Sequence, residues 1–249
     1  MDKSKEEIQT IESFNYQWSN LINAKNILSD PNWINNVESY ILDELQVDRD
    51  WIRGKTVIDV GCGGGRWTYG FVKLDCKVTA SDVSVGPCNY TTERVPQAEV
   101  IQSDLFELPA KVGGRKFDIV WCWGVIHHTG NPKAAFDTLT KLMRPDGGII
   151  HIYVYSFDRG IRVKVLRKIL NLISFNSRKR LISMMIKMRI LHGDVHGCFD
   201  ALSPKLNYEI KETELKSWFD SYELSYRLHV PQWANRSRDI FATGSRRTT

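Results

Sequence analysis

The fold is set by the stretch Val57-Ile58-Asp59-Val60-Gly61-Cys62-Gly63-Gly64-Gly65, in which a short apolar run leads into a cluster of glycines. Glycine is required where the backbone takes a positive φ or lies against a ligand with no Cβ in between. A buried strand that ends in such a turn predicts a ligand site at its carboxyl end. The turn alone does not identify the ligand, because dinucleotide-binding proteins use a similar one.

Outward from this turn, short apolar runs alternate with segments that can form helices, such as Pro132–Met143. The strand candidates are Thr56–Val60, Lys77–Ala80, Glu99–Gln102, Phe117–Trp121 and Gly148–Tyr155. Strands that are apolar throughout and separated by helices predict an α/β protein with a parallel sheet covered on both faces. Ligand-binding groups are then expected where the strands end.

The flanking regions are predicted from local signals. Residues 1–54 are expected to be helical, and an N-cap candidate followed by a proline predicts a new helix near Ser29-Asp30-Pro31. The apolar face of that helix is predicted to be Ile34, Val37, Ile41, Leu42 and Leu45.

After the fifth strand candidate, the segment from Asp158 to about Pro204 is expected to form two helices. A helix at Thr213–Phe219 follows. Two strands, Tyr222–Val230 and Asp239–Thr243, have no helix between them, so they are expected to pair antiparallel at a sheet edge.

Charge distinguishes two kinds of ligand at the glycine turn. Counted from Gly61, the sixth position of a GxGxxG motif is Arg66, which departs from the dinucleotide-binding pattern. A carboxylate at Asp59 would repel a pyrophosphate and attract the ammonium of an amino-acid moiety. S-adenosylmethionine carries such an ammonium and a sulfonium but no phosphate, so it is the predicted cofactor.

Two more carboxylates follow the next two strand candidates. Asp82 can accept hydrogen bonds from a ribose diol, and Asp104 is placed to contact an adenine amino group. Each of the three aspartates could instead be an N-cap or a loop carboxylate, and this alternative stays open for any one of them. Three carboxylates at successive strand ends favour a shared ligand.

These residues resemble the class I S-adenosylmethionine-dependent methyltransferases over roughly residues 50–155. The stretch Val57–Gly65 resembles the first motif of the family, Asp82 its acidic residue after the second strand, and Ser103-Asp104 its third motif. The stretches Phe117–Thr129 and Leu142–Gly148 resemble the region of the fourth and fifth strands, with Asp146 where glycine is usual. The resemblance implies a doubly wound, mostly parallel seven-stranded sheet whose last strand is antiparallel.

Further resemblances bear on the acceptor. His127-His128 is similar to the ubiquinone-biosynthesis type of small-molecule methyltransferases. The stretches Phe14–Trp18 and Asp200–Tyr208 resemble parts of relatives that modify natural products and sugars. The resemblance implies transfer of a methyl group to a small molecule, and a hydroxyl oxygen is the expected acceptor atom.

Twelve residues are expected to contact the cofactor. Trp123 and Gly124 are expected to meet its methionine portion, although Trp123 could equally be a core residue. The twelve residues are Asp59, Gly61, Cys62, Gly63, Gly65, Asp82, Val83, Ser103, Asp104, Leu105, Trp123 and Gly124.

Histidine supplies the candidate general base. His128 follows the fourth strand, where the methyl group should point, although His127 and His128 could equally cap a helix or orient a loop. His151 lies inside an apolar strand and is expected to be a core residue. His192 and His196 flank a glycine-containing loop and could line the acceptor pocket, although solvation in the loop is the expectation. No histidine has ligand partners at useful spacing, so no metal is predicted.

Composition sets the wider limits. A chain of 249 residues with 42% hydrophobic and 25% charged residues is long enough for one α/β domain with a buried core. Its five cysteines include no CxxC pair, which favours a reducing compartment over a disulfide framework or zinc site. Because Met1–Thr10 is polar and no apolar run is long enough to span a bilayer, a cytoplasmic protein is expected, with peripheral membrane attachment left open.

Charge is unevenly distributed along the chain. Arg159–Arg189 contains ten Lys or Arg and no acidic residue, whereas the net charge of the whole chain is only +5. Apolar residues at helical spacing accompany these charges, which predicts amphipathic helices forming a lid over the active site. Contact with an anionic membrane surface, or with a phosphorylated or lipid-linked acceptor, stays open, and nucleic acid is disfavoured because no RNA-binding module accompanies the segment.

The expected organisation is a single domain. It comprises a helical segment at 1–54, a cofactor-binding core at 55–155, a helical lid insertion at 156–205, and a final helix with a strand pair at 206–249. The alternatives to a small-molecule methyltransferase are an RNA methyltransferase that uses the basic segment 159–189 and a cofactor-binding partner protein without catalysis.

Overall fold

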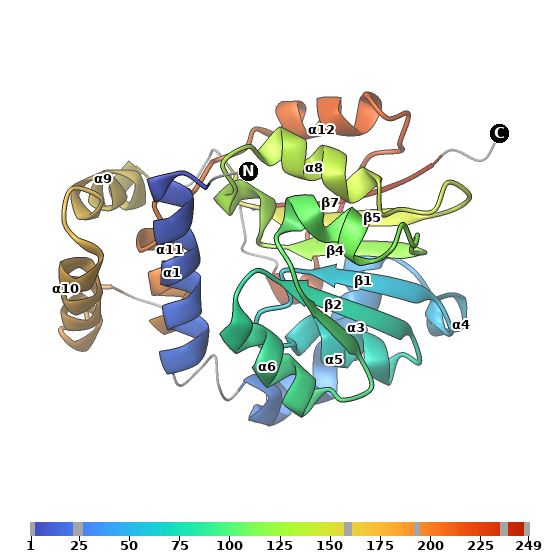
Figure 1. The fold of residues 1–249 in the computed structure, drawn as a ribbon, viewed down its shortest axis with the longest axis horizontal. Helices are drawn as coiled ribbons and strands as arrows, with labels where there is room; N and C mark the ends of the chain where they lie inside the picture. The colour runs from blue at the N-terminus through green and yellow to red at the C-terminus, as the bar shows by residue number, and fades with distance from the viewer. Residues whose placement is uncertain (1–2, 22–26, 157–160, 192–194, 235–238, 247–249) are drawn as a thin grey trace.

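A computed structural model of the chain describes residues 3–21, 27–156, 161–191, 195–234 and 239–246. Its centre is a seven-stranded sheet in the order β3-β2-β1-β4-β5-β7-β6 (Figure 1). The strands are β1 (Thr56–Val60), β2 (Lys77–Asp82), β3 (Glu99–Gln102), β4 (Ile119–Trp123), β5 (Ile149–Val154), β6 (Arg227–Leu228) and β7 (Ile240–Ser245). The predicted fold class, a mostly parallel seven-stranded α/β sheet, is confirmed.

The pairing of the strands follows the expected pattern. Strands β1 to β5 pair in parallel, and β7 runs antiparallel between β5 and β6. Strand β6 has only two residues, fewer than the predicted Tyr222–Val230. The backbone N–H groups of Ser225 and His229 on either side of it still donate to the carbonyl groups of Ser245 and Phe241.

Both faces of the sheet are covered by helices, as Figure 1 shows. One face packs against α3 (Pro31–Leu45) and α5 (Arg66–Lys73), and the other against α8 (Pro132–Thr140) and α12 (Glu212–Asp220). The other helices around the sheet are α4 (Arg49–Ile52), α6 (Val85–Arg94) and α7 (Leu108–Lys111).

The strand residues alternate between these two faces. In β4, Ile119 and Trp121 pack toward α3 and α5, whereas Val120 and Cys122 pack toward α8 and α12, and all four are completely buried. A strand buried on both faces is apolar throughout, which explains the uninterrupted apolar runs in the sequence.

The helix predicted near Ser29-Asp30-Pro31 is confirmed as α3. The Asp30 side chain accepts a hydrogen bond from the backbone N–H of Asn32 at 3.0 Å, and Pro31 occupies the first turn. A proline is tolerated there because its missing N–H would have no helical partner. On the predicted apolar face, Val37, Ile41 and Leu45 are fully buried, and Ile34 and Leu42 are half-buried.

The insertion after β5 contains three helices in its described residues, so the expectation of two is wrong. They are α9 (Ile161–Leu170), α10 (Phe175–Lys187) and α11 (Val195–Leu202). Phe199 and Leu202 of α11 pack with Leu170 and Ile182 in a small core of their own. This packing stabilises a helix too short to be stable alone, which local sequence signals do not reveal.

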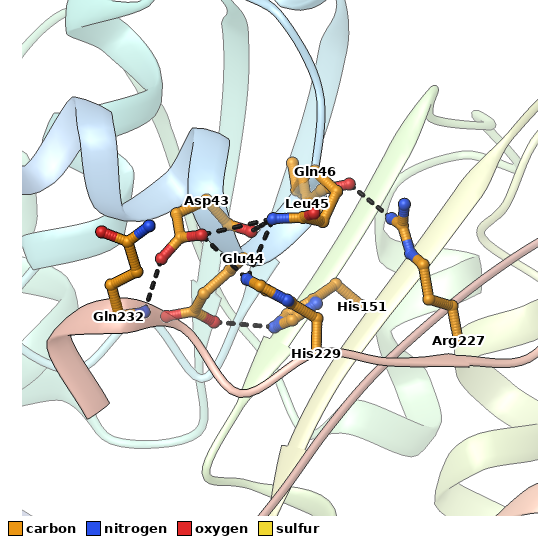
Figure 2. A network of polar contacts seen from close by, with 8 residues as sticks. All are labelled: Asp43, Glu44, Leu45, Gln46, His151, Arg227, His229 and Gln232. Atoms are coloured by element: carbon orange, nitrogen blue, oxygen red, sulfur yellow. Dashed lines mark hydrogen bonds and ion pairs between the residues drawn. The ribbon is translucent and has the colours of Figure 1, made fainter. Parts of the chain in front are cut away.

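The end of α3 is tied to the antiparallel edge of the sheet by polar contacts (Figure 2). Asp43 pairs with His229 at 2.8 Å and accepts a hydrogen bond from the backbone N–H of Gln232 at 2.7 Å. His151 is completely buried and contacts both Glu44 and Thr243. Its predicted role as a core histidine with polar partners is confirmed.

Candidate functional site

A cavity of about 770 Å³ lies where the parallel strands end. This volume falls in the upper part of the range of about 300–1,000 Å³ that is usual for small-molecule sites. The loops after β1, β2, β3 and β4 form one side of the cavity, while α1 (Lys5–Asn20) and α11 contribute side chains to the other. In Figure 1, α1 stands between the sheet and helices α9 and α10.

The glycine turn presents bare backbone to this cavity. Gly61 has a φ of +77°, and a Cβ placed there would come within 2.2 Å of the Val125 side chain. Gly63, at a φ of +53°, lies directly under the indole of Trp18 from α1. Gly61 and Cys62 line the cavity, whereas Gly63 and Gly65 shape the turn from behind it. Glycine is therefore needed at both positions, because the side chains of Val125 and Trp18 occupy the space that a Cβ would take.

Asp59 lies beneath the turn instead of facing the cavity. Its carboxylate is buried and accepts a hydrogen bond from the Thr68 hydroxyl at 2.6 Å. Burial raises the pKa of Asp59 to about 6. The side chain is absent from the cavity wall, so its influence on a ligand would be exerted through the field under the turn and not through direct contact.

Asp82 does face the cavity, with its carboxylate held in place by the backbone. It accepts hydrogen bonds from the N–H groups of Gly63 at 3.1 Å and Ser84 at 2.9 Å. Burial raises the pKa of Asp82, and these hydrogen bonds oppose the shift. A carboxylate has about four acceptor positions, so two remain for a diol.

Asp104 lines the cavity together with Ser103, Leu105 and Val83. Both of its oxygens are engaged: one accepts from the backbone N–H of Phe106 at 2.9 Å, and the other pairs with Lys3 at 2.5 Å. Asp104 is therefore the N-cap that sequence analysis left open, and it also lies in the wall of the cavity.

His128 is oriented by a carbonyl group. Its Nδ1 lies 2.9 Å from the carbonyl oxygen of Leu206. A carbonyl can only accept, so Nδ1 carries the hydrogen and Nε2 is the basic atom of the neutral ring. Nε2 lies 3.7 Å from Oδ1 of Asp200. His128 also contacts the ring of Phe14, with centroids 4.8 Å apart.

Asp200 of α11 is the main polar group of the cavity that sequence analysis did not place there. Burial raises its pKa to about 7, while Arg66 lowers it and Asp239 raises it further. His196 and Gly197 of the same helix also line the cavity, so His196 is not the solvated loop residue that was expected. His192 lies outside the described residues.

Opposite the glycine turn, hydrogen bonds join α1 to the segment that follows α11. The Ser13 hydroxyl donates to the Ser203 hydroxyl at 2.7 Å, and the backbone N–H of Leu206 donates to the Thr10 hydroxyl at 2.9 Å. Phe14 and Trp18 are thereby brought to the wall opposite the glycine turn. The only signal for them in the sequence was the resemblance of Phe14–Trp18 and Asp200–Tyr208 to natural-product enzymes.

Comparisons with known proteins agree with this geometry. A family model described as "Methyltransferase domain" matches residues 57–147, from β1 to just before β5. The ubiquinone biosynthesis O-methyltransferase of Proteus mirabilis is 25% identical over 80% of this chain and 73% of its own length. The protein of that name from Actinobacillus pleuropneumoniae is 26% identical over 43% of this chain. The chain spans about half the length of most of the curated relatives that it matches, and 48% of the Actinobacillus protein.

Solved structures share the whole fold. The magnesium protoporphyrin IX methyltransferase of Synechocystis, solved with bound SAM, has a TM-score of 0.60 at 14% identity, over 99% of this chain and 100% of that one. The N-methyltransferase NodS of Bradyrhizobium japonicum, in complex with S-adenosyl-L-homocysteine, has a TM-score of 0.59 at 13% identity, over 96% and 100%. Residues 57–147 therefore match a methyltransferase domain, and the chain as a whole shares the fold of these methyltransferases. The likeness of the structures concerns the fold, and it extends to the N-terminal helix and the insertion.

Several cations of the basic segment 159–189 have internal partners. Lys164 and Arg167 pair with Glu209. Arg178 is completely buried, and its guanidinium donates to the carbonyl groups of Leu170, Ile173 and Ser203. Lys179 lies over the rings of Tyr16 and Phe175. Arg159 and the side chain of Arg162 lie outside the described residues.

Among the described residues, neither a metal site nor a membrane-spanning helix accompanies the cavity. No group of three or more His, Cys, Asp or Glu among them is arranged to hold a metal ion. None of the helices in the described ranges is both long enough and apolar enough to cross a membrane.

Proposed function

We propose that this chain transfers a methyl group from S-adenosylmethionine to a hydroxyl oxygen of a small, planar acceptor. The observation that carries the proposal is the placement of Asp82 and His128 on one cavity, at either side of the bare backbone of Gly61. Binding of a nucleoside cofactor requires an acceptor for its ribose diol and a backbone that can lie close to it. Methylation of a hydroxyl requires an oriented base as well.

The residues fit the cofactor at one end of the cavity. Asp82 would accept from the ribose diol, with the N–H groups of Gly63 and Ser84 fixing its orientation. The wall formed by Val83, Ser103, Asp104 and Leu105 would surround the adenine. The bound cofactor supplies a methyl group on a sulfonium, so the leaving thioether is neutral. The main task of the protein is then to align the acceptor with the methyl group, which can contribute about 7–11 kcal/mol in well-oriented systems.

His128 would remove the proton of the acceptor hydroxyl. Its Nδ1–H is held by the Leu206 carbonyl, so Nε2 is the atom that takes the proton. The resulting imidazolium would lie 3.7 Å from the Asp200 carboxyl oxygen, where an ionised carboxylate stabilises it. Such a base contributes roughly 10²–10⁴-fold to the rate.

Aromatic side chains around His128 favour a planar acceptor. Phe14, Tyr155 and Trp18 all line the cavity, and the rings of Phe14 and Tyr155 each contact His128 edge-on. Aromatic rings pack well against other rings in offset or edge-to-face geometry. A phenol can pack its ring against these side chains and give its hydroxyl proton to His128, so phenols are the acceptor class that we propose. The ubiquinone biosynthesis O-methyltransferases among the relatives are named for a pathway with a quinone product, which supports this choice.

Calorimetry tests the cofactor. S-adenosylhomocysteine and NAD are titrated side by side into the wild-type protein and into Asp82→Ala. We expect S-adenosylhomocysteine alone to bind, and the substitution to weaken it by about 10-fold or more, because hydrogen bonds to a charged group contribute about 1.5–3 kcal/mol. Binding of NAD without S-adenosylhomocysteine would refute the proposal.

A panel of phenols, catechols and sugars then tests catalysis, with formation of S-adenosylhomocysteine as the readout. A protein that binds the cofactor and shows no turnover with any of them would support the alternative of a non-catalytic partner. The RNA alternative predicts strongly salt-dependent RNA binding. The internal partners of Lys164, Arg167, Arg178 and Lys179 weigh against it, because these cations are not presented to a phosphate backbone.

The outer face of α9 and α10 supports a peripheral contact as an addition to this function. Leu172, between the two helices, is 85% exposed. The same stretch of chain also exposes Val165, Ile169, Met184, Met188 and Ile190. Lys168, Arg180, Lys187 and Arg189 are exposed nearby. We propose contact with an anionic lipid surface, tested by sedimentation with anionic and neutral vesicles at two salt concentrations. Equal binding to both kinds of vesicle, or a Leu172→Glu variant that binds unchanged, would remove this proposal.

A further inference from the structure

The guanidinium of Arg66 lies among three tryptophan rings. Its Cζ is 4.3 Å from the centroid of Trp123, 5.0 Å from Trp67 and 5.1 Å from Trp33. These distances are within the roughly 6 Å over which a cation is attracted to an aromatic face. Arg66 also belongs to the wall of the cavity. The three rings, which we call the tryptophan cage, therefore hold a positive charge at the edge of the ligand site.

This charge has no carboxylate partner within ion-pair distance among the described residues. Glu44, Asp59 and Asp200 raise the pKa of Arg66 only through longer-range attraction, and burial, the largest cause, lowers it. Aromatic faces offer no lone pairs to the five N–H donors, which lie in the plane of the guanidinium. Arg66 is half-buried in the cavity wall, so an anionic ligand group would accept charge-assisted hydrogen bonds from its N–H groups.

The second cation of the cavity wall is already neutralised. Lys3 pairs with Asp104 at 2.5 Å, at the end of the cavity near β3. Arg66 is thus the one cation among the described lining residues without an ion-pair partner. The cavity has carboxylates at Asp82 and Asp104, near the ends of β2 and β3, and at Glu7, Asp30 and Asp200 elsewhere in its wall. A ligand that lies across it is expected to carry its anionic group next to Arg66.

The order of the strands gives the direction of such a ligand. Asp104 follows β3, Asp82 ends β2, Gly61 follows β1 and Trp123 ends β4, and these four strands are consecutive neighbours in the sheet. A cofactor whose nucleoside is held at Asp104 and Asp82 would extend its amino-acid portion over Gly61 toward Trp123. The guanidinium of Arg66 lies over the ring of Trp123. The far end of the methionine portion carries an ammonium and a carboxylate, and only the carboxylate is attracted to the charge of Arg66.

We propose that Arg66, oriented by the tryptophan cage, binds the carboxylate of the methionine portion of S-adenosylmethionine. The proposal rests on the function proposed above. Arginine suits this role because a planar guanidinium can stack on aromatic rings and offer two parallel N–H groups to one carboxylate. Lysine can do neither. The cage fixes the plane of the guanidinium before the ligand arrives, which lowers the entropy cost of binding.

A matched pair of ligands tests the proposal. Decarboxylated S-adenosylmethionine keeps the adenosine, the sulfonium and the amine of S-adenosylmethionine and lacks only the carboxylate. Both are titrated into the wild-type protein, Arg66→Gln and Arg66→Lys by calorimetry. Arg94→Gln is the control variant, because Arg94 lies over the ring of Tyr90 on α6 at 5.2 Å, outside the cavity.

We expect the wild-type protein to bind S-adenosylmethionine about 10–100-fold more tightly than the decarboxylated ligand, as expected for charge-assisted hydrogen bonds. Arg66→Gln should abolish most of this preference while changing the affinity for the decarboxylated ligand by less than about 3-fold. Arg66→Lys should recover only part of the preference, and Arg94→Gln should keep all of it.

Equal wild-type affinities for the two ligands would overturn the proposal and leave the proposed function intact. A preference that survives in Arg66→Gln would overturn it as well. Failure of the wild-type protein to bind either ligand would instead refute the proposed function. The wild-type comparison needs no substitution, so it decides the matter even if the Arg66 variants do not fold.

Discussion

The Nε2 atom of His151 lies 2.8 Å from Oε2 of Glu44, and both side chains are completely buried between α3 and the sheet (Figure 2). The other ring nitrogen of His151 contacts the Thr243 hydroxyl at 2.9 Å, and Trp121 stacks on the ring with centroids 4.2 Å apart. The pair therefore joins the N-terminal helical segment to strands β5 and β7.

Removal of the histidine alone should be strongly destabilising. In His151→Phe, the ring can still stack on Trp121, but the buried carboxyl of Glu44 loses its partner. We expect the free energy of unfolding at pH 8 to fall by about 3–5 kcal/mol. The matched variant Glu44→Gln keeps a hydrogen-bonding group without the charge and should cost about 1 kcal/mol or less. Urea denaturation measures both, and equal losses would contradict this account.

The loss in His151→Phe should depend on pH. Burial raises the pKa of Glu44 above its ordinary value of 4.5, and the variant removes His151, which lowers it. The folded protein would then keep a proton that the unfolded chain releases above pH 4.5, so stability is present at low pH and is lost as pH rises toward the folded-state pKa. We expect a smaller loss at pH 5 than at pH 8. The double variant Glu44→Gln with His151→Phe should not show this dependence.

His128→Gln should remove the proposed base and leave the cofactor site intact. With a phenolic acceptor from the panel, kcat should fall roughly 10²–10⁴-fold. The Kd for S-adenosylhomocysteine should change by less than about 3-fold. His229→Gln is the control, because His229 pairs with Asp43 near the antiparallel edge of the sheet and is not among the residues that line the cavity. Full turnover by His128→Gln would refute this role.

Gly61→Ala should disturb the turn far more than a comparable glycine elsewhere. Gly61 and Gly147 share a positive φ of +77° and +72°, but a Cβ at Gly61 would meet Val125 at 2.2 Å, whereas a Cβ at Gly147 would meet nothing within 4 Å. We expect Gly147→Ala to cost about 1–2 kcal/mol from backbone strain alone. Gly61→Ala should cost at least about 1 kcal/mol more and abolish binding of S-adenosylhomocysteine. Thermal unfolding of both variants measures the loss of stability, and calorimetry measures binding of S-adenosylhomocysteine. The difference between the two variants is the effect of the collision with Val125, because both share the backbone strain.

Arg178→Leu should loosen the insertion without unfolding the sheet. The substitution leaves the carbonyl groups of Leu170, Ile173 and Ser203 without their donor, and each unsatisfied buried group costs about 1–3 kcal/mol. Hydrogen exchange should accelerate in α9–α11 while the strands stay protected. The exposed neighbour Arg180 provides the control, since Arg180→Leu should change stability by about 0.5 kcal/mol or less. Unchanged exchange in the insertion would contradict the prediction.

Local patterns in the sequence were sufficient for the sheet and for half of the site. Apolar runs bounded by helices predicted β1 to β5 within a few residues, because strands buried on both faces must be apolar throughout. Asp30 and Pro31 predicted the start of α3 because capping depends only on neighbouring residues. Gly61 and Asp82 reached the cavity as expected, since the end of a parallel strand points to one edge of the sheet.

The remainder was decided by contacts between residues far apart in the chain. Only packing brings Asp200 to within 3.7 Å of His128 and places Thr10 under Leu206, and no local pattern records a separation of that length. The direction of a side chain is equally a tertiary property. Asp59, at the strand end chosen by the charge argument, turns inward to Thr68, whereas Arg66, noted only as a departure from a motif, is held at the cavity by three rings. Periodicity in the sequence is enough to locate the strands that end at the site. Which side chains face the cavity depends on the rotamers, and these are fixed by the residues that pack around them.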